Sequence, residues 1–148
     1  MATKPSCESL RWVIKKAKIG NIRIALDINW RPTFWSETHD PTAGPNDDAL
    51  AAMQPLIAAA SLLKLAKEEA MWIFGTTDPS SISAGLSQTP DVVVTDGGNP
   101  VKWQMAGASG VLQVSAPSPL VDTTGAGDAF TAGLLHQLVQ TEAWSIEP

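Results

Sequence analysis

The sequence predicts a single α/β domain built on a mostly parallel sheet. Apolar runs with strand character alternate along the chain with stretches whose apolar residues recur at helical spacing. The clearest strand pattern lies at Asp91–Thr95, and a clear helical pattern follows the glycines at 125–127. The chain has 148 residues, of which 44% are hydrophobic, and this suits one globular domain. Such an alternation is typical of βαβ units, in which helices cover a parallel sheet.

Each expected element is bounded by residues that start or stop it. Gly20 ends the first helix. Asn46 or Asp47 caps the second helix. Pro55 marks a kink or a break within that helix. In chain order we expect a helix at 6–19, a strand at 22–29, a helix from the Asn46 cap to near Ala60, a strand at 62–66, a short helix ending at Gly75, a helix beginning at Asp78 or Pro79, a strand at 91–95, two short strands at 100–107 and 109–117, and a helix from Gly125 or Gly127 to near Gln140.

Composition and charge exclude several classes of protein. The net charge is -5, and the sequence has no basic stripe that would neutralise nucleic-acid phosphates. The basic cluster at 11–18 is interpreted as a solvated helix face. Cys7 is the single cysteine, so no internal disulfide can form and a reducing compartment is expected. No apolar run is long enough to cross a membrane, and the N-terminus lacks the apolar core of a signal peptide. We therefore expect a cytoplasmic protein that binds neither nucleic acid nor a membrane.

The segment VDTTGAGDAF, residues 121–130, places two glycines and an acid directly before an apolar helical run. The first N–H groups of a helix have no partner within the helix, and the helix dipole is positive there. Gly125 and Gly127 let the backbone approach a ligand closely, so the turn predicts an anion site suited to phosphate. Asp128 lies in the first turn, where it could accept a proton from a hydroxyl. Phosphoryl transfer requires both features.

This turn has other interpretations. A Walker A loop requires a Gly-Lys pair, which the sequence lacks. A dinucleotide fingerprint requires a third glycine where Phe130 stands, and a strand directly before the turn, where Pro117 and Pro119 intervene. A plain capped helix start, with glycines that allow close packing, remains the alternative to an anion site.

Four segments carry a resemblance to a known family. DTTGAGDAFTAGLL resembles the C-terminal signature of the PfkB (ribokinase-like) carbohydrate kinases. ALDINWRPTFW is similar to a D-x-N-x-R-P-x-x-W segment of the fructokinase-like members, LLKLAKEEAMWIFG to the segment with the N-x-x-E motif, and VVVTDGGNPVKW to the strand and turn that approach the nucleotide. The resemblance covers 22–140. It implies a ribokinase-like three-layer α/β/α fold with a mostly parallel sheet.

The resemblance implies roles for the residues around the glycine turn. Asp128 matches the catalytic base for the sugar hydroxyl, and the backbone of the three residues before it matches the anion hole, namely Gly125, Ala126 and Gly127. Asp122 and Thr123 match positions that help to hold a monovalent cation or the nucleotide.

Glu69 matches the glutamate that organises Mg²⁺ and its waters in the family. The asparagine of the same motif falls at Ala66, which cannot hydrogen-bond through its side chain. The alternative for Glu68 and Glu69 is a solvated first turn of a helix.

Two further pairs complete the implied site. Thr95 and Gly97 match the nucleotide-facing turn, although Pro100 stands where the family has a glycine, and a plain strand-ending turn is the alternative. Asn29 and Arg31 match positions that face the phosphates or the sugar, and an arginine suits phosphate because its fork binds two oxygens. Asp27 is placed at the strand end, where anchoring of the loop is the alternative to a role in the site.

The activity implied by the resemblance is ATP-dependent phosphorylation of a sugar hydroxyl, as in fructokinases, with ATP, Mg²⁺ and a monovalent cation as cofactors. The alternative is a non-catalytic module that binds nucleotide or a partner. Family chains are roughly twice as long, so residues 1–148 are expected to form a partial PfkB domain, the C-terminal portion without the N-terminal half and the β lid. A truncated sheet exposes an edge and an apolar face. We therefore expect association with a second copy or with a complementing chain.

Overall fold

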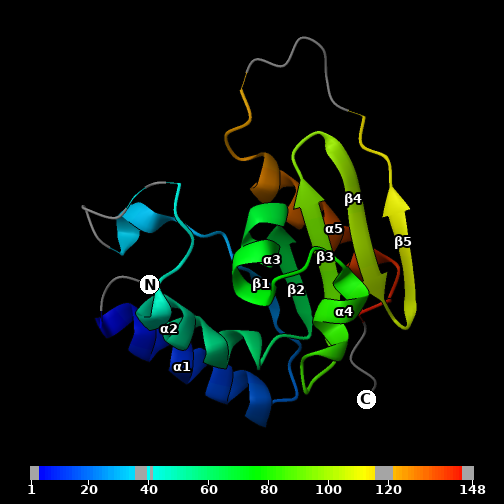
Figure 1. The fold of residues 1–148 in the computed structure, drawn as a ribbon. Coiled ribbons are helices and arrows are strands. Elements are labelled where there is room, and N and C mark those ends of the chain that lie inside the picture. The colour runs from blue at the N-terminus through cyan, green and yellow to red at the C-terminus, as the bar shows by residue number, and fades with distance from the viewer. Residues whose placement is uncertain (1–3, 36–39, 41, 116–121, 145–148) are drawn as a thin grey trace.

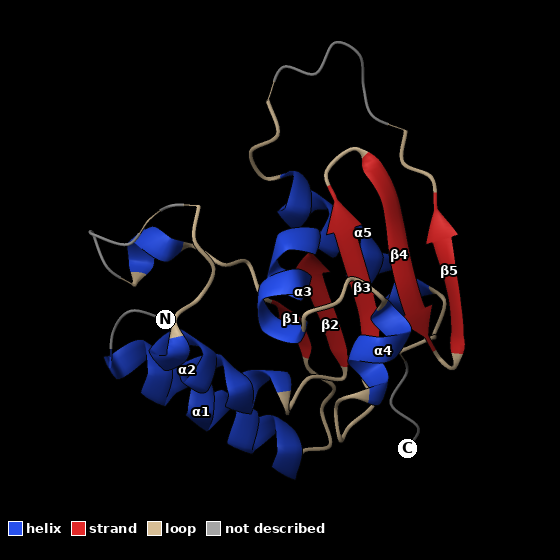
Figure 2. Ribbon diagram, in the orientation of Figure 1, coloured by secondary structure: helices blue, strands red, loops and turns tan. Residues whose placement is uncertain are grey.

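The computed structural model describes residues 4–35, 40, 42–115 and 122–144. They form a five-stranded sheet with helices on both faces (Figures 1 and 2). The elements, in chain order, are α1 (Lys4–Ile19), β1 (Ala25–Asp27), the 3-10 turn η1 (Pro32–Phe34), α2 (Asp47–Ile57), β2 (Leu62–Ala66), α3 (Lys67–Phe74), α4 (Pro79–Ala84), β3 (Asp91–Asp96), β4 (Asn99–Met105), β5 (Ala108–Leu112) and α5 (Ala126–Gln140).

The strands lie in their order along the chain, from β1 at one edge to β5 at the other. β1 pairs with β2, and β2 with β3, in parallel, so that Asp27 lies opposite Lys64 and Ala66 opposite Thr95. β3, β4 and β5 pair antiparallel as successive hairpins. The expected α/β fold is confirmed, and its sheet is mixed, because short turns rather than helices connect the last three strands.

The alternation of side chains along the strands divides the core into two layers. On one face, Leu63 and Leu65 of β2 pack with Val92 and Val94 of β3 against α2, α3 and α4. On the other face, Leu62 and Val93 pack with residues of β4 and with one side of α5. Helix α1 lies on α2 (Figure 1). This arrangement gives the expected three layers, with α5 covering the second face.

The observed helix boundaries agree closely with the sequence expectations. α2 begins after Asn46, α3 ends at the left-handed Gly75, and α4 begins after Asp78 with Pro79 in its first turn. α2 ends at Ile57, shortly after Pro55, rather than near the expected Ala60.

The edge strand β1 is shorter than the expected strand at 22–29. Only three of its residues pair with β2, and the chain then turns at Asn29, which has a φ of 46°. β5 covers only the start of the expected strand at 109–117, of which residues 116–117 lie outside the described residues. Within the described part of the chain, no helix combines the length and the apolar character needed to span a membrane.

Candidate active site

The start of α5 is shaped by a hydrogen-bonded turn. The Asp122 carboxylate accepts the Thr124 N–H and the Thr124 hydroxyl, both at 2.8 Å. The chain then passes through Gly125 at a φ of 79°, a conformation that favours glycine. The Ala126 N–H donates to the Thr123 carbonyl at 3.1 Å. The amide of Ala126, one of the three residues predicted for the anion hole, is therefore bonded within the turn.

The two amides that follow, those of Gly127 and Asp128, have no acceptor within the helix. They lie at the positive end of the helix dipole, where an anion is stabilised. The Asp128 carboxylate is on the third residue of α5 and is exposed. The structure thus brings two backbone donors and one carboxylate into a single helical turn.

Hydrogen bonding holds Asp122 in its charged form. The Thr124 amide, and then the Thr124 hydroxyl, lower the pKa of the Asp122 carboxyl below its ordinary value. At neutral pH Asp122 is therefore ionised and accepts both hydrogen bonds from Thr124, which hold the turn in this conformation. Its predicted role toward a monovalent cation, and that of Thr123, stay predictions.

The carboxyl end of β1 is tied to the same turn. Lys64 lies in the buried strand β2, and its ammonium contacts both oxygens of Asp27, at 3.2 and 3.1 Å. Oδ2 of Asp27 also accepts the hydroxyl of Thr131 on α5 at 2.9 Å. A Cβ added at Gly127 would lie 3.2 Å from the Lys64 ammonium. β1, β2 and the first turn of α5 therefore meet at this cluster.

Glu69 is not solvated, although a solvated first turn of the helix was the alternative interpretation of this residue. Its side chain is buried, and its two oxygens accept the N–H groups of Trp30, at 2.6 Å, and of Ala66, at 2.7 Å. Burial raises the pKa of the Glu69 carboxyl, while the two N–H donors and the nearby Lys64 ammonium oppose the rise. Glu68, by contrast, is exposed. Glu69 thus joins the start of α3 to the loop that follows β1.

The donor set does not fit a metal ion held directly by Glu69. Both of its oxygens already accept a backbone N–H, and the carboxylate is buried. The described residues contain no group of three acidic, histidine or cysteine side chains that could hold a metal ion. The role predicted for Glu69 toward Mg²⁺ and its waters stays a prediction.

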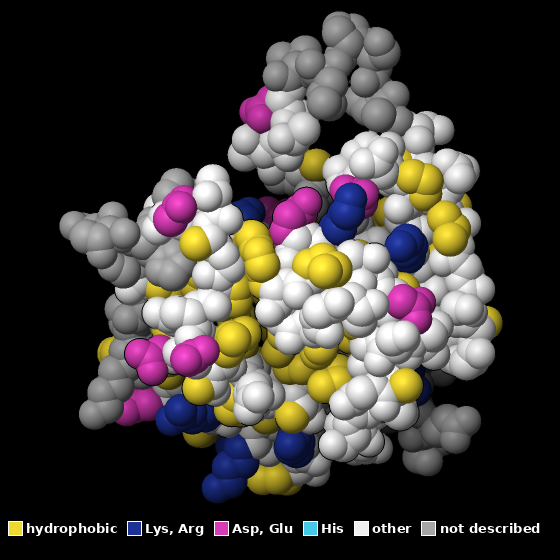
Figure 3. All heavy atoms as spheres, viewed as in Figure 1, with side chains coloured by type: hydrophobic (Ala, Val, Ile, Leu, Met, Phe, Trp, Pro, Cys, Tyr) yellow, Lys and Arg dark blue, Asp and Glu magenta, His cyan; other side chains and the backbone are white. Residues whose placement is uncertain are grey.

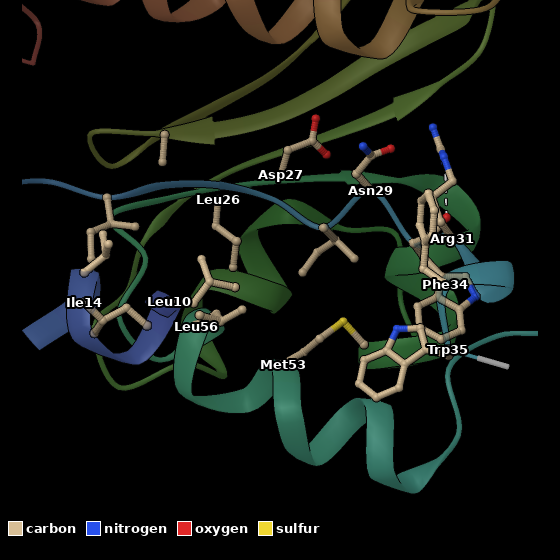
Figure 4. Close-up of a pocket in the computed structure, with 15 residues that line it drawn as sticks. Leu10, Ile14, Leu26, Asp27, Asn29, Arg31, Phe34, Trp35, Met53 and Leu56 are labelled. Carbon is tan, nitrogen blue, oxygen red and sulfur yellow. Dashed lines mark hydrogen bonds between the residues drawn. The ribbon is translucent and has the colours of Figure 1, made fainter. Parts of the chain in front are cut away.

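Asn29 and Arg31 lie at the rim of a cavity of about 430 Å³ beside β1. The cavity is lined mainly by apolar side chains of α1, α2 and the loop after β1. Figure 4 shows Asp27, Asn29 and Arg31 projecting to the opposite side of the chain from Leu26 and Met53, toward the helix that covers the second face. The Arg31 guanidinium donates to the carbonyl of Trp30 at 3.1 Å. The three polar side chains therefore follow one another from the end of β1 into the loop after it, on the side that faces α5.

Thr95 and Gly97 lie where β3 ends and turns into β4. The Thr95 hydroxyl donates to the Leu65 carbonyl at 3.3 Å, and Gly97 has a φ of 55° in the hairpin turn. Beside this turn, Lys67 forms an ion pair with Asp96 at 3.0 Å. The contacts of the described residues do not join Thr95 or Gly97 to the α5 turn, so their predicted role toward a nucleotide stays a prediction.

The chain matches a known protein family over nearly its whole length. A family model described as pfkB family carbohydrate kinase matches residues 3–147. The chain belongs to this family.

The chain is similar to individual members of this family. A fructokinase of Vibrio alginolyticus is 31% identical over 153 residues, which cover 100% of this chain and 46% of that relative. A fructokinase of Klebsiella pneumoniae is 32% identical over 145 residues, with 93% of this chain and 43% of the relative covered. The crystal structure of fructokinase from Vibrio cholerae O395 with fructose, ADP and a calcium ion superposes with a TM-score of 0.73 at 29% identity, over 93% of this chain and 42% of the other. This chain therefore spans less than half the length of each of these three kinases.

Sequence reasoning missed two members of the cluster, Lys64 and Thr131. The run LLKLA predicts a strand, and it places a lysine among apolar residues. A lysine at a buried strand position requires a charged partner, and this signal could have identified it. Thr131 carried no such signal, because a threonine within a helix is ordinary.

Proposed function

We propose that this chain carries the phosphoryl-transfer site of a fructokinase-like sugar kinase, with MgATP and a sugar as its substrates. The observation that supports the proposal is the first turn of α5, which combines the amides of Gly127 and Asp128 with the exposed Asp128 carboxylate. Membership of the carbohydrate kinase family and the similarity to fructokinases give the class of substrate.

In the proposed reaction, a sugar hydroxyl oxygen attacks the γ-phosphorus of ATP. A bond forms between that oxygen and phosphorus, the bond from phosphorus to the β–γ bridging oxygen breaks, and the hydroxyl proton passes to the Asp128 carboxylate. The amides of Gly127 and Asp128, with the helix dipole behind them, stabilise the negative charge on the transferred group. The products are ADP and a sugar phosphate.

The remaining site residues take the roles that the family resemblance assigns. Asn29 and Arg31 would bind the phosphates or the sugar, and a guanidinium with a free edge suits phosphate oxygens. Two pairs of residues would contact the nucleotide or a monovalent cation, namely Thr95 with Gly97 and Asp122 with Thr123. Mg²⁺ would enter as part of the MgATP substrate.

We also propose that a second copy or a complementing chain covers the β1 side of the molecule. Within the described residues, β1 is an edge strand, and an apolar cavity lies beside it. Trp12, Val13 and Ile22 are large apolar residues with more than half of their surface exposed. Apolar side chains also show at the surface between α2 and the rest of the molecule (Figure 3). A monomer at micromolar concentration in sedimentation experiments, with no binding of a hydrophobic dye, would contradict this proposal.

The alternative is a module that binds nucleotide or a partner without catalysis. One observation favours it: Glu69, the residue matched to the metal-organising position, is committed to two backbone amides. In this case calorimetry would detect binding of MgADP, but the protein would not transfer phosphate from ATP to a sugar.

The proposed function is tested by ATP-dependent phosphorylation of fructose and a small panel of other sugars. We expect Asp128→Asn to lower the rate by about a hundredfold or more, as the loss of a general base does. Asp48→Asn is the matched control, because Asp48 is also an exposed acid in the first turn of a helix. Equal rates for Asp128→Asn and wild type would contradict the role of Asp128, and no turnover by wild type would favour the non-catalytic alternative.

A further inference from the structure

The cluster formed by Lys64, Asp27 and Thr131 has no role in the proposed reaction, and its burial needs an explanation. The side chain of Lys64 has a relative exposure of 8%, and that of Asp27 has 19%. Removing an ammonium from water is costly, and an ion pair inside a protein often stabilises the fold less than apolar residues would. A purely structural role therefore explains this pair poorly.

Asp27 connects the ion pair to α5. Its Oδ2 receives both the Lys64 ammonium, at 3.1 Å, and the Thr131 hydroxyl, at 2.9 Å. The same hydroxyl lies 2.9 Å from the Gly127 carbonyl, but it has a single proton to donate. A carboxylate is the stronger acceptor, so the proton is expected to point to Asp27. The first turn of α5 is thereby held to the carboxyl end of β1.

Lys64 also limits how closely the turn can approach the sheet. A Cβ added at Gly127 would lie 3.2 Å from the ammonium, so the bare glycine backbone rests beside the charged group. Gly127 directly precedes Asp128, and its amide is one of the two proposed donors to phosphate. The hydrogen bond of Thr131 holds α5 against the sheet, and the Lys64 ammonium limits how closely the first turn of α5 can approach the sheet.

α5 needs such an anchor because its packing is thin. None of its residues is fully buried, and its apolar contacts come from one side, through residues such as Phe130 and Leu134. Apolar packing of this kind resists separation from the sheet better than it resists sliding or rotation, because it has no direction. Directed hydrogen bonds at the first turn supply the missing constraint.

We propose that Lys64, Asp27 and Thr131 are positioning residues, which fix the height and rotation of the α5 start and so aim Asp128 and the two amides at the substrates. The inference rests on the proposed function as far as catalysis is concerned. Its structural part, the anchoring of α5, stands on the contacts alone.

The test compares Thr131→Val with Thr141→Val in the full chain. Both threonines contact the carbonyl four residues earlier, at 2.9 Å for Thr131 and 2.7 Å for Thr141, but Thr131 alone of the two also reaches the Asp27 carboxylate. We expect Thr131→Val to speed exchange of the helix-bonded amides at 129–131 about tenfold, the scale of one lost hydrogen bond to a charged group, while Thr141→Val leaves these amides unchanged. Thr131→Ser keeps the hydroxyl and should restore wild-type exchange.

Kinetics separate positioning from general stability. If the chain phosphorylates a sugar, Thr131→Val should lower kcat about tenfold with KM for the sugar nearly unchanged, and Thr131→Ser should recover kcat. Equal exchange at 129–131 in the two valine variants would overturn the inference. Faster exchange with an unchanged kcat would overturn the link to catalysis. A wild-type chain without turnover would contradict the proposed function, and the exchange data would still decide whether α5 is anchored.

Discussion

The helices α2 and α5 begin in opposite ways. α2 begins after Asn46, whose side-chain oxygen accepts the N–H of Ala49 at 2.9 Å. α5 begins after Gly125, which offers no side-chain acceptor. The same helical geometry leaves the same unpaired amides at both starts. A start at which a capping side chain accepts one of the amides serves the fold, whereas a start without such a cap leaves its amides open to a ligand.

α3 shows a third arrangement. It begins after Ala66, and the acceptor for the Ala66 amide comes from Glu69 in the first turn. The second oxygen of Glu69 receives the amide of Trp30, which lies 39 residues earlier in the chain. The Glu69 carboxylate therefore caps the start of α3 and also binds the loop that carries Trp30. The three helix starts therefore differ in how much of their hydrogen-bonding capacity remains for a ligand.

The largest effect on stability is expected at α3. Glu69→Gln replaces one acceptor oxygen by an amide group that can only donate, so one of the two buried N–H groups loses its partner. We expect the free energy of unfolding to fall by about 1–3 kcal/mol in urea titrations. Glu68→Gln, on the exposed side of the same turn, is the control and should change it by less than about 0.5 kcal/mol. Similar values for the two variants would show that the Glu69 contacts contribute little.

The next effect is expected at Gly125. Gly125→Ala places a side chain at a φ of 79° and should destabilise the protein by about 1–2 kcal/mol, although the added Cβ meets no other atom. Because the turn would relax, MgADP affinity measured by calorimetry should fall as well. Gly133→Ala is the control within the same helix, where the substitution should be neutral or stabilise by about 0.5–1 kcal/mol. If Gly125→Ala binds MgADP with wild-type affinity, the turn does not take part in nucleotide binding.

A smaller effect is expected at α2. Asn46→Ala removes the cap and should lower the free energy of unfolding by about 1 kcal/mol. MgADP affinity should stay at the wild-type value, because the α2 start has no ligand role. A loss of affinity as large as that of Gly125→Ala would remove the distinction between the two helix starts.

The smallest effect is a dependence of stability on pH that comes from Glu69. Its pKa in the folded protein is raised by burial, so folding takes up a proton between the ordinary glutamate pKa and the raised value. The contribution of Glu69 to stability is therefore greatest below the ordinary pKa, and it is lost as pH rises through the folded-state pKa. Unfolding curves collected across mildly acidic pH should show this slope in the wild type but not in Glu69→Gln. Parallel pH profiles for the two proteins would contradict the raised pKa.

The sequence predicted local features well, because each depends on neighbouring residues. The sequence offers Asn46 or Asp47 as the start of one helix and Asp78 or Pro79 as the start of another, and the side chains of Asn46 and Asp78 cap α2 and α4. Gly75 was expected to end a helix, and it adopts the left-handed conformation that closes α3. The glycines at 125–127 were expected to open the last helix, which begins at Ala126.

Features that depend on residues far apart in the chain could not be predicted. Glu69 belongs to a first helical turn, where a glutamate is ordinarily solvated, and its burial follows from the loop that carries Trp30. The link between Asp27 and Thr131 joins residues 104 positions apart. Lys64 was visible as a charge within an apolar run, but its partner across the parallel pair required the strand register. The family resemblance supplied roles for single residues but not these contacts.

The central claim is that the α5 start, unlike the α2 start, binds the phosphates of a nucleotide. The most direct measurement follows backbone amide resonances of the full chain by NMR during titration with MgADP. We predict saturable shifts for the amides of Gly127 and Asp128, with the amides of Asp48 and Ala49 in α2 unmoved. Nucleotide binding that leaves Gly127 and Asp128 unshifted, or that shifts both helix starts alike, would contradict the account.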